Sequence, residues 1–188
     1  DVSLVTTEPI HVPWYGTFVT TPKVSDDDAT VDVKTELRNS SSMSAGVVLK
    51  TAILDPSGRQ VAEYATPQTI GPGALGTVDQ RGDVRSPNLW SPDTPTLYAV
   101  TFGAAGDSLT DHIGFRTIKV QGTDILLNGK PIFLRGISMH EEEIGANPSR
   151  NMTPEASRAL LSEIKNGLHG NYVRLSHYPH SEVTTRLA

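Results

Sequence analysis

The feature that most constrains the fold is a change of pattern near residue 120. Before it, short runs of alternating apolar and polar residues are separated by turn residues, which is typical of strands with one buried face. After it, the order becomes strand, long loop, helix, strand and the start of a second helix, which favours a parallel α/β arrangement. We therefore expect a mainly β chain, with a β-sandwich over residues 1–120 and an α/β part over residues 121–188.

The first part contains five runs with the alternation of strands. They cover residues 29–37, 46–54, 60–64, 96–102 and 111–120. Asp55-Pro56-Ser57-Gly58 predicts a turn after the second run, whereas residues 71–73 and 87–95 hold too many Gly and Pro for regular structure. Residues 1–5 also alternate, and they predict a strand already under way where the sequence opens.

The second part carries clear turn and cap signals. Asn128-Gly129 stands between two apolar runs and predicts a hairpin, because both central residues of a type I′ turn need a positive φ. Thr153-Pro154-Glu155 predicts the start of a helix, and Asn166-Gly167 predicts its end. Residues 172–175 should form the next strand, and residues 181–187 the next helix.

Composition excludes several classes of protein. The chain has 16 Lys plus Arg against 21 Asp plus Glu, with no basic cluster, so we do not expect a nucleic acid partner. It has no cysteine, which excludes disulfides and Cys-ligated metals, and it has no apolar run of about 18 residues that could span a membrane. The composition is compatible with a cytoplasmic, periplasmic or secreted protein.

Two polar residues stand out on the strands of the second part. His140 falls at the C-terminal end of a strand expected from Ile132, the end at which a (β/α)8 barrel places catalytic groups. Arg174 lies between apolar neighbours in the next strand and, if buried, needs a carboxylate or a substrate oxygen. Glu141-Glu142-Glu143 beside His140 could be imagined as a metal site, but a charged loop is usually solvated, so we expect none.

Five groups of residues then follow one another in a recognisable order. They are Leu89-Trp90-Ser91-Pro92 with Pro95-Thr96-Leu97-Tyr98, Gly114-Phe115-Arg116-Thr117-Ile118, Leu127-Asn128-Gly129-Lys130-Pro131, Leu134-Arg135-Gly136-Ile137-Ser138-Met139-His140-Glu141 and Val173-Arg174-Leu175-Ser176-His177-Tyr178-Pro179. Over essentially the whole chain this order and spacing resemble glycoside hydrolase family 2. The resemblance implies an Ig-like sandwich over residues 1–120, followed over 121–188 by the first two βα units of an incomplete (β/α)8 barrel. A complete barrel needs about 250 residues, so both ends look cut from a longer polypeptide.

The resemblance also implies an activity, the hydrolysis of terminal β-glycosides with retention by two carboxyl groups about 5 Å apart. In the family the acid/base glutamate follows an asparagine, and no Asn-Glu pair occurs in this sequence. We therefore expect no catalytic residue and no cofactor here, and no activity from the chain alone. Arg174 would lie beside the nucleophile, and His140 and His177 would contact sugar hydroxyls or the charge of the transition state.

Several alternatives stay open. A β-galactosidase-like specificity is favoured, with β-glucuronidase and β-mannosidase as alternatives, and the chain could instead be a non-catalytic spacer or carbohydrate-binding module. Its partners would be a carbohydrate substrate and the remainder of the barrel, and exposed strand edges leave a homo-oligomer open. One group of aromatic residues fits a sugar-stacking platform or, with more weight, the sandwich core: Trp14, Tyr64, Trp90 and Tyr98.

Overall fold

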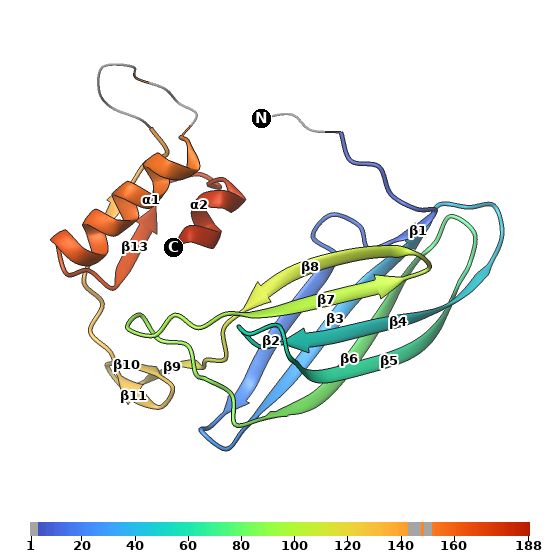
Figure 1. The fold of residues 1–188 in the computed structure, drawn as a ribbon, viewed down its shortest axis with the longest axis horizontal. Coiled ribbons are helices and arrows are strands. Elements are labelled where there is room, and N and C mark those ends of the chain that lie inside the picture. Colours follow the sequence, from blue (N-terminus) through green and yellow to red (C-terminus); the bar gives the residue numbers. More distant parts are fainter. Residues whose placement is uncertain (1–3, 143–147, 149–151) are drawn as a thin grey trace. The chain divides into compact units, whose positions relative to one another are not determined.

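The computed structural model describes residues 4–142, 148 and 152–188 (Figure 1). The chain divides into two compact units, Asp1–Pro131 and Ile132–Ala188. We call them the sandwich unit and the strand–helix unit, and we describe each by itself. Most of the regular structure is strand, which confirms the expectation of a mainly β chain.

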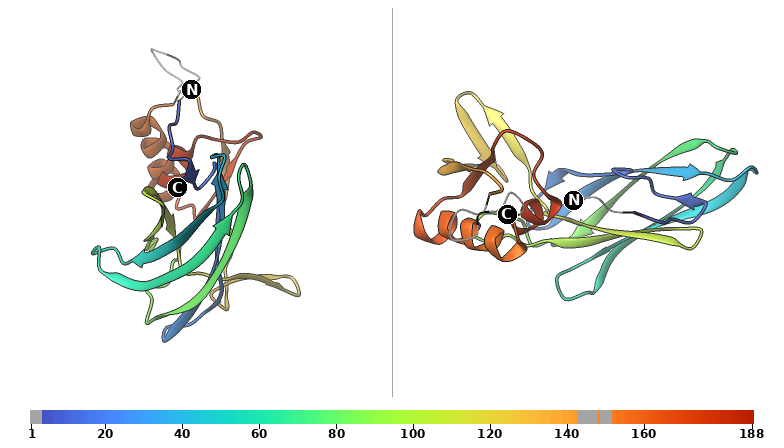
Figure 2. Two further views of the ribbon diagram at one scale, coloured as in Figure 1. Left: turned by 90° about the vertical axis from the view of Figure 1, so that its right-hand side faces the viewer. Right: turned by 90° about the horizontal axis from the view of Figure 1, so that it is seen from above.

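Two antiparallel sheets form the sandwich unit. In the first sheet β3 (Asp28–Asn39) pairs with β6 (Leu75–Arg85) along one edge and with β1 (Ile10–His11) and β2 (Thr17–Val24) along the other. The second sheet has the order β5–β4–β7–β8. Its strands are β4 (Ala45–Leu54), β5 (Gln60–Ile70), β7 (Tyr98–Ala104) and β8 (Asp107–Ile113). Figure 2 shows the two sheets as layers from two further directions.

The predicted alternation decides which side chains enter the core between the layers. In β3, Val31, Val33 and Leu37 are buried, whereas Lys34 and Arg38 on the opposite face are exposed. The second sheet contributes residues such as Phe102, and the buried side chains of both sheets form one cluster. This arrangement is that of a β-sandwich, as the sequence predicts.

Three expectations for the sandwich strands need correction. Leu4 and Val5 are exposed and lie outside any strand, so the strand predicted at residues 1–5 is wrong in its described part. The run 111–120 is two strands, β8 and β9 (Ile118–Gln121), because the intervening segment turns to bury Phe115. The alternation pattern also failed to predict β2, where Pro22 lies in a register shift between Thr20 and Lys23, and β6, whose inward face includes Gly76, Gln80 and Gly82.

Gly82 explains part of the packing between the sheets. A Cβ atom at this position of β6 would lie 2.2 Å from the ring of Tyr64 on β5. Only glycine therefore allows the Tyr64 ring to lie against the β6 backbone. Burial, and then the negative charge of Asp83, raise the pKa of the Tyr64 phenol.

A small three-stranded sheet ends the sandwich unit. It consists of β9, β10 (Asp124–Leu127) and β11 (Lys130–Pro131), in the order β11–β10–β9. Asn128 and Gly129 have φ values of 51° and 77°, which confirms the positive-φ turn. Asn128 also donates from Nδ2 to the Trp90 carbonyl at 3.0 Å, so the turn residue fastens the hairpin to the sandwich. The boundary expected at residue 120 would assign the β10–β11 hairpin to the barrel part. In the structure this hairpin belongs to the same compact unit as the sandwich, which ends at Pro131.

The strand–helix unit has the predicted order of elements. Parallel strands β12 (Gly136–Met139) and β13 (Tyr172–Leu175) are separated by α1 (Pro154–Ser162) and a π-helical turn, η1 (Glu163–Gly167). The N-cap prediction is confirmed, since Thr153 Oγ1 accepts a hydrogen bond from the Ala156 N–H at 3.2 Å. The helix α2 (Glu182–Leu187) follows β13 and is capped by Ser181.

Asn171 fixes where the parallel pair begins. Its side-chain Oδ1 accepts from the Arg135 N–H at 2.8 Å, and its Nδ2 donates to the Phe133 carbonyl at 3.0 Å. The strand predicted from Ile132 therefore begins only at Gly136, after these side-chain bonds replace the ladder. Gly136 itself lies so close to the Tyr172 carbonyl that an added Cβ atom would be 1.8 Å from that oxygen.

Candidate functional site

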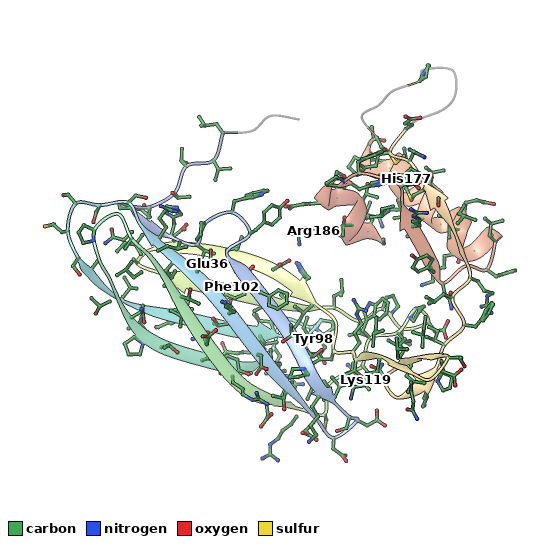
Figure 3. All side chains as sticks on the ribbon, turned by 180° about the vertical axis from the view of Figure 1, so that it is seen from behind. Glu36, Tyr98, Phe102, Lys119, His177 and Arg186 are labelled. Carbon is green, nitrogen blue, oxygen red and sulfur yellow. The ribbon has the colours of Figure 1, made fainter. Side chains whose placement is uncertain are left out.

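The ends of β12 and β13 bring two of the three predicted site residues together. Met139 and Leu175 are the last residues in register, and the Ser176 N–H donates to the Met139 carbonyl at 3.0 Å. His140 and His177 follow directly, and their ring centroids lie 5.7 Å apart with an edge-to-face angle of 83°. Figure 3 labels His177 in the strand–helix unit. The parallel pairing thus places both imidazoles at the carboxyl end of the two strands.

An aromatic group surrounds this histidine pair. The ring of Tyr178 lies 5.9 Å from that of His140 and stacks on His180, with centroids 4.7 Å apart. The His180 side chain is fully buried, and its Nε2 lies 3.1 Å from the Ser176 carbonyl, to which an Nε2–H donates. Ser176 is also buried and joins His177 through a cis peptide bond. The buried side chains of Ser176 and His180 thus anchor the segment after β13, while His177 and Tyr178 between them are exposed.

Glu141 lies at the centre of the polar contacts, although from the sequence we considered it only in a metal site that we did not expect. Its backbone N–H donates to the Tyr178 hydroxyl at 2.9 Å. Its carboxylate accepts from the Ser181 N–H at 2.9 Å and 3.0 Å and from the Thr184 hydroxyl. Burial raises the pKa of this carboxyl, but the hydrogen bonds from Thr184 and Ser181 outweigh it, so the pKa is lowered and the group is ionised at neutral pH.

The third predicted residue, Arg174, is placed differently from the two histidines. It is in register with Ser138 in the parallel pair, and its side chain is exposed. Among residues 4–142, 148 and 152–188, no carboxylate forms an ion pair with it. The strand presents a solvated positive charge, so the cost of burying an unpaired guanidinium does not arise in this chain.

The metal site considered at His140 and Glu141–Glu143 lies only partly within the described residues. Within the described part of the chain, no three His, Cys, Asp or Glu side chains come close enough together to hold a metal ion. Both oxygens of the Glu141 carboxylate are already engaged by Ser181. Glu143 lies outside the described residues.

The four aromatic residues with two interpretations do not share one role. Tyr98 is a core residue, as preferred, since it is 3% exposed and packs edge-to-face on Phe115, with the centroids 4.7 Å apart. Figure 3 shows Tyr98 with Phe102 on the sandwich. Trp90 lies under the Arg116 guanidinium at 4.9 Å. Trp14 is 68% exposed beside Tyr15, so the core interpretation is wrong for this residue.

None of the helices among the described residues has the length and apolar character needed to cross a membrane.

The sandwich and the parallel strand pair align together with solved structures of enzymes that hydrolyse glycosidic bonds. The family model for glycosyl hydrolases family 2 matches residues 11–116, more than half of the sequence, and the chain belongs to this family. The match lies within the sandwich unit.

One curated relative and two solved structures illustrate the similarity. The chain is 31% identical to the β-galactosidase BoGH2A of Bacteroides ovatus over 95% of its own length and 21% of that protein. It aligns with a family 2 member from Bacteroides cellulosilyticus at a TM-score of 0.87 and 29% identity, covering 96% of this chain and 25% of that one. A Bacteroides uniformis β-glucuronidase aligns at a TM-score of 0.82 and 27% identity, covering 95% and 23%. The chain therefore spans about a fifth to a quarter of the length of these relatives.

Proposed function

We propose that the chain is part of a longer retaining β-glycosidase, most simply a β-galactosidase, and that residues 132–188 form the opening of its (β/α)8 barrel. The observation that carries the proposal is the meeting of His140 and His177, at 5.7 Å, at the carboxyl end of two adjacent parallel strands. That end of a barrel is where catalytic groups gather, in essentially every barrel enzyme. A strand–helix–strand order with parallel pairing is what such a barrel requires.

In this proposal the chain supplies supporting groups and not the two catalytic glutamates. The exposed Arg174 guanidinium is available to a carboxylate from a later strand, whose ionised form it would favour. His140 and His177 present imidazole nitrogens that can hydrogen-bond sugar hydroxyls or stabilise developing charge. The chain by itself would then bind sugar weakly and hydrolyse nothing.

The preferred substrate is a terminal β-galactoside. Support comes from the curated relative with 31% identity, which is named a β-galactosidase. A solved structure that is 27% identical to this chain is named a β-glucuronidase, which supports the glucuronide alternative. Hydrolysis of β-mannosides is the third candidate. The three sugars differ at C2, C4 and C6, so discrimination would come from side chains that reach these positions.

A comparison of hydrolysis rates tests the proposal. The longer polypeptide that contains this sequence should release 4-nitrophenol from the β-galactoside faster than from the β-glucuronide or β-mannoside, while residues 1–188 alone should release none. Arg174→Ala in the longer polypeptide should lower kcat strongly without unfolding it. Hydrolysis by residues 1–188 alone, or an unchanged rate for Arg174→Ala, would contradict the proposal.

The same assay tests a non-catalytic role. This alternative is considered because the family model matches only residues 11–116, within the sandwich unit. A longer polypeptide that binds immobilised galactosides but hydrolyses none of the three substrates would be a carbohydrate-binding protein.

A further inference from the structure

Beyond Met139 and Leu175 the backbone ladder no longer holds β12 and β13 together. Among the residues that the structure describes, the last backbone bond between the two segments is the one from the Ser176 N–H to the Met139 carbonyl. His140 and His177 both lie beyond it. Something other than the sheet must keep the two imidazoles at their separation.

Glu141 makes contacts that can do this from both of its ends. It follows His140 directly, and its N–H binds the hydroxyl of Tyr178, which follows His177 directly. Its carboxylate binds the Ser181 N–H and the Thr184 hydroxyl at the start of α2. One residue thus connects the end of β12 to three residues that follow His177, which are Tyr178, Ser181 and Thr184.

The surroundings of Glu141 make this connection stiff. Its side chain is 13% exposed, and the fully buried His180 lies beside it, with Nδ1 4.0 Å from Glu141 Oε2. Thr184 is itself held by Ser157 on α1, since the two hydroxyl oxygens lie 3.0 Å apart in a buried contact. Hydrogen bonds to an ionised carboxylate are stronger than neutral ones, and a partly buried site excludes competing water.

We propose that Glu141 is a positioning residue, which through its backbone N–H and its carboxylate fixes His140 relative to His177 for contact with the substrate. The inference rests on the function proposed above and adds a residue that the family resemblance did not single out. Glu141 does not touch the sugar in this proposal. It acts on the transition state by setting where the two imidazoles stand.

Four variants of the longer enzyme test the role: Glu141→Ala, Glu141→Gln, Tyr178→Phe and Glu142→Ala. Loss of the bridge displaces the histidines, and a displacement of about 1 Å can lower turnover by about 10²-fold, so Glu141→Ala should lose about that factor in kcat with little change in KM. Glu141→Gln should recover most of the rate, because its amide can still accept from Ser181 and donate to the Thr184 oxygen. Tyr178→Phe should lose less than Glu141→Ala, because it removes only the acceptor of the backbone N–H.

Glu142→Ala is the matched control, since Glu142 is the next residue and is exposed. It should have the wild-type kcat. Crystal structures of the wild-type protein and of the two Glu141 variants give a second readout, and the ring separation of 5.7 Å should persist in Glu141→Gln and change in Glu141→Ala. A purely structural role would lower the melting temperature of Glu141→Ala and leave kcat per folded molecule unchanged.

The outcomes separate this inference from the proposed function. A wild-type polypeptide without glycosidase activity would overturn the function and the catalytic purpose of Glu141, while the crystal structures would still decide whether Glu141 sets the ring separation. An active wild-type enzyme whose Glu141→Ala variant matches Glu142→Ala in kcat would overturn the positioning role alone. A crystal structure of Glu141→Ala in which the His140 and His177 rings keep their separation would also overturn the positioning role.

Discussion

The two units of this chain bury apolar side chains to very different extents. The sandwich unit has a cluster of 14 buried hydrophobic residues drawn from both sheets. Among the described residues of the strand–helix unit, only Met139 and Ile164 are buried hydrophobics, while Phe133 is 78% exposed and Leu168 is 55% exposed. Apolar burial is the main favourable term in folding, so the sandwich holds its own core, whereas the strand–helix unit is held mainly by polar and backbone bonds. The contrast supports the proposal that residues 132–188 are the opening of a larger barrel.

The largest effect should come from truncating the same residue type in the two units. Phe102→Ala removes a fully buried ring and should lower the free energy of unfolding by about 3–5 kcal/mol. Phe18→Ala, at an exposed position of β2, and Phe133→Ala should each change it by less than about 0.5 kcal/mol. Urea unfolding followed by circular dichroism measures all three, and tryptophan fluorescence reports on the sandwich alone, because Trp14 and Trp90 both lie there. A loss for Phe133→Ala equal to that for Phe102→Ala would abolish the contrast.

The next effect tests whether backbone packing holds the strand–helix unit. Gly136→Ala introduces a Cβ atom 1.8 Å from the Tyr172 carbonyl oxygen, and a fixed backbone atom cannot yield as a side chain can. We expect a loss of about 1–3 kcal/mol in local stability, seen as faster amide hydrogen exchange in β12 and β13. Gly46→Ala is the control, since a Cβ atom there meets nothing within 4 Å. Equal exchange in both variants would mean that the parallel pair is looser than described.

A smaller effect should follow from removing one helix cap. Thr153→Ala deletes the oxygen that accepts from the Ala156 N–H and should destabilise α1 by about 1 kcal/mol. Thr153→Ser keeps that oxygen and should restore most of the loss. Amide hydrogen exchange in the first turn of α1 provides the measurement, and no difference between the two variants would count against the cap.

The smallest effects concern two carboxylates, one in each unit. Hydrogen bonding from Ser57, opposed by burial and assisted by Arg59, lowers the pKa of Asp55 to about 2 from its ordinary 3.8. A lowered folded-state pKa adds stability that is present above pH 3.8 and is lost as the pH falls towards about 2. Carboxyl NMR titration should give that midpoint, and Ser57→Ala should raise it whereas the remote Ser108→Ala should not.

Glu141 should also titrate below its ordinary pKa of 4.5, and Thr184→Val should raise the midpoint of its titration. If both carboxyls titrate at their ordinary pKa, the hydrogen bonds described for Asp55 and Glu141 do not favour the ionised forms.

Local signals in the sequence predicted much of the fold, because they depend on a residue and its near neighbours. The alternation of β3 predicted which of its side chains are buried, and Asn128-Gly129 predicted a turn whose φ values are positive. Thr153 predicted the start of α1 to within a residue. The strand β2 escaped prediction because a register shift at Pro22 breaks its alternation, and β6 escaped because its inward positions include Gly76, Gln80 and Gly82. Both are held in the sheet by pairing with β3, which no local pattern encodes.

The candidate site was predictable only in part. The motif resemblance pointed to His140 and His177, and the parallel pairing brings them together. Glu141 was missed because its partners, Ser181 and Thr184, are about 40 positions away in the sequence. The only local hint was that an acidic residue directly follows His140 at the end of a strand. The exposure of the Arg174 side chain depends on whether another segment covers β13. The sequence of β13 alone does not encode this.

The contact between Tyr64 and Gly82 has a consequence for the side of the sandwich at which it lies. The strands β5 and β6 are edge strands of their sheets among the described residues. The Tyr64 ring fills the space at which a Cβ atom of residue 82 would stand, so it covers the inward face of β6 there and does not reach the hydrogen-bonding edge of the strand. Loss of the ring, as in Tyr64→Ala, should therefore open a gap that admits water between the two layers, seen as faster amide hydrogen exchange in β6.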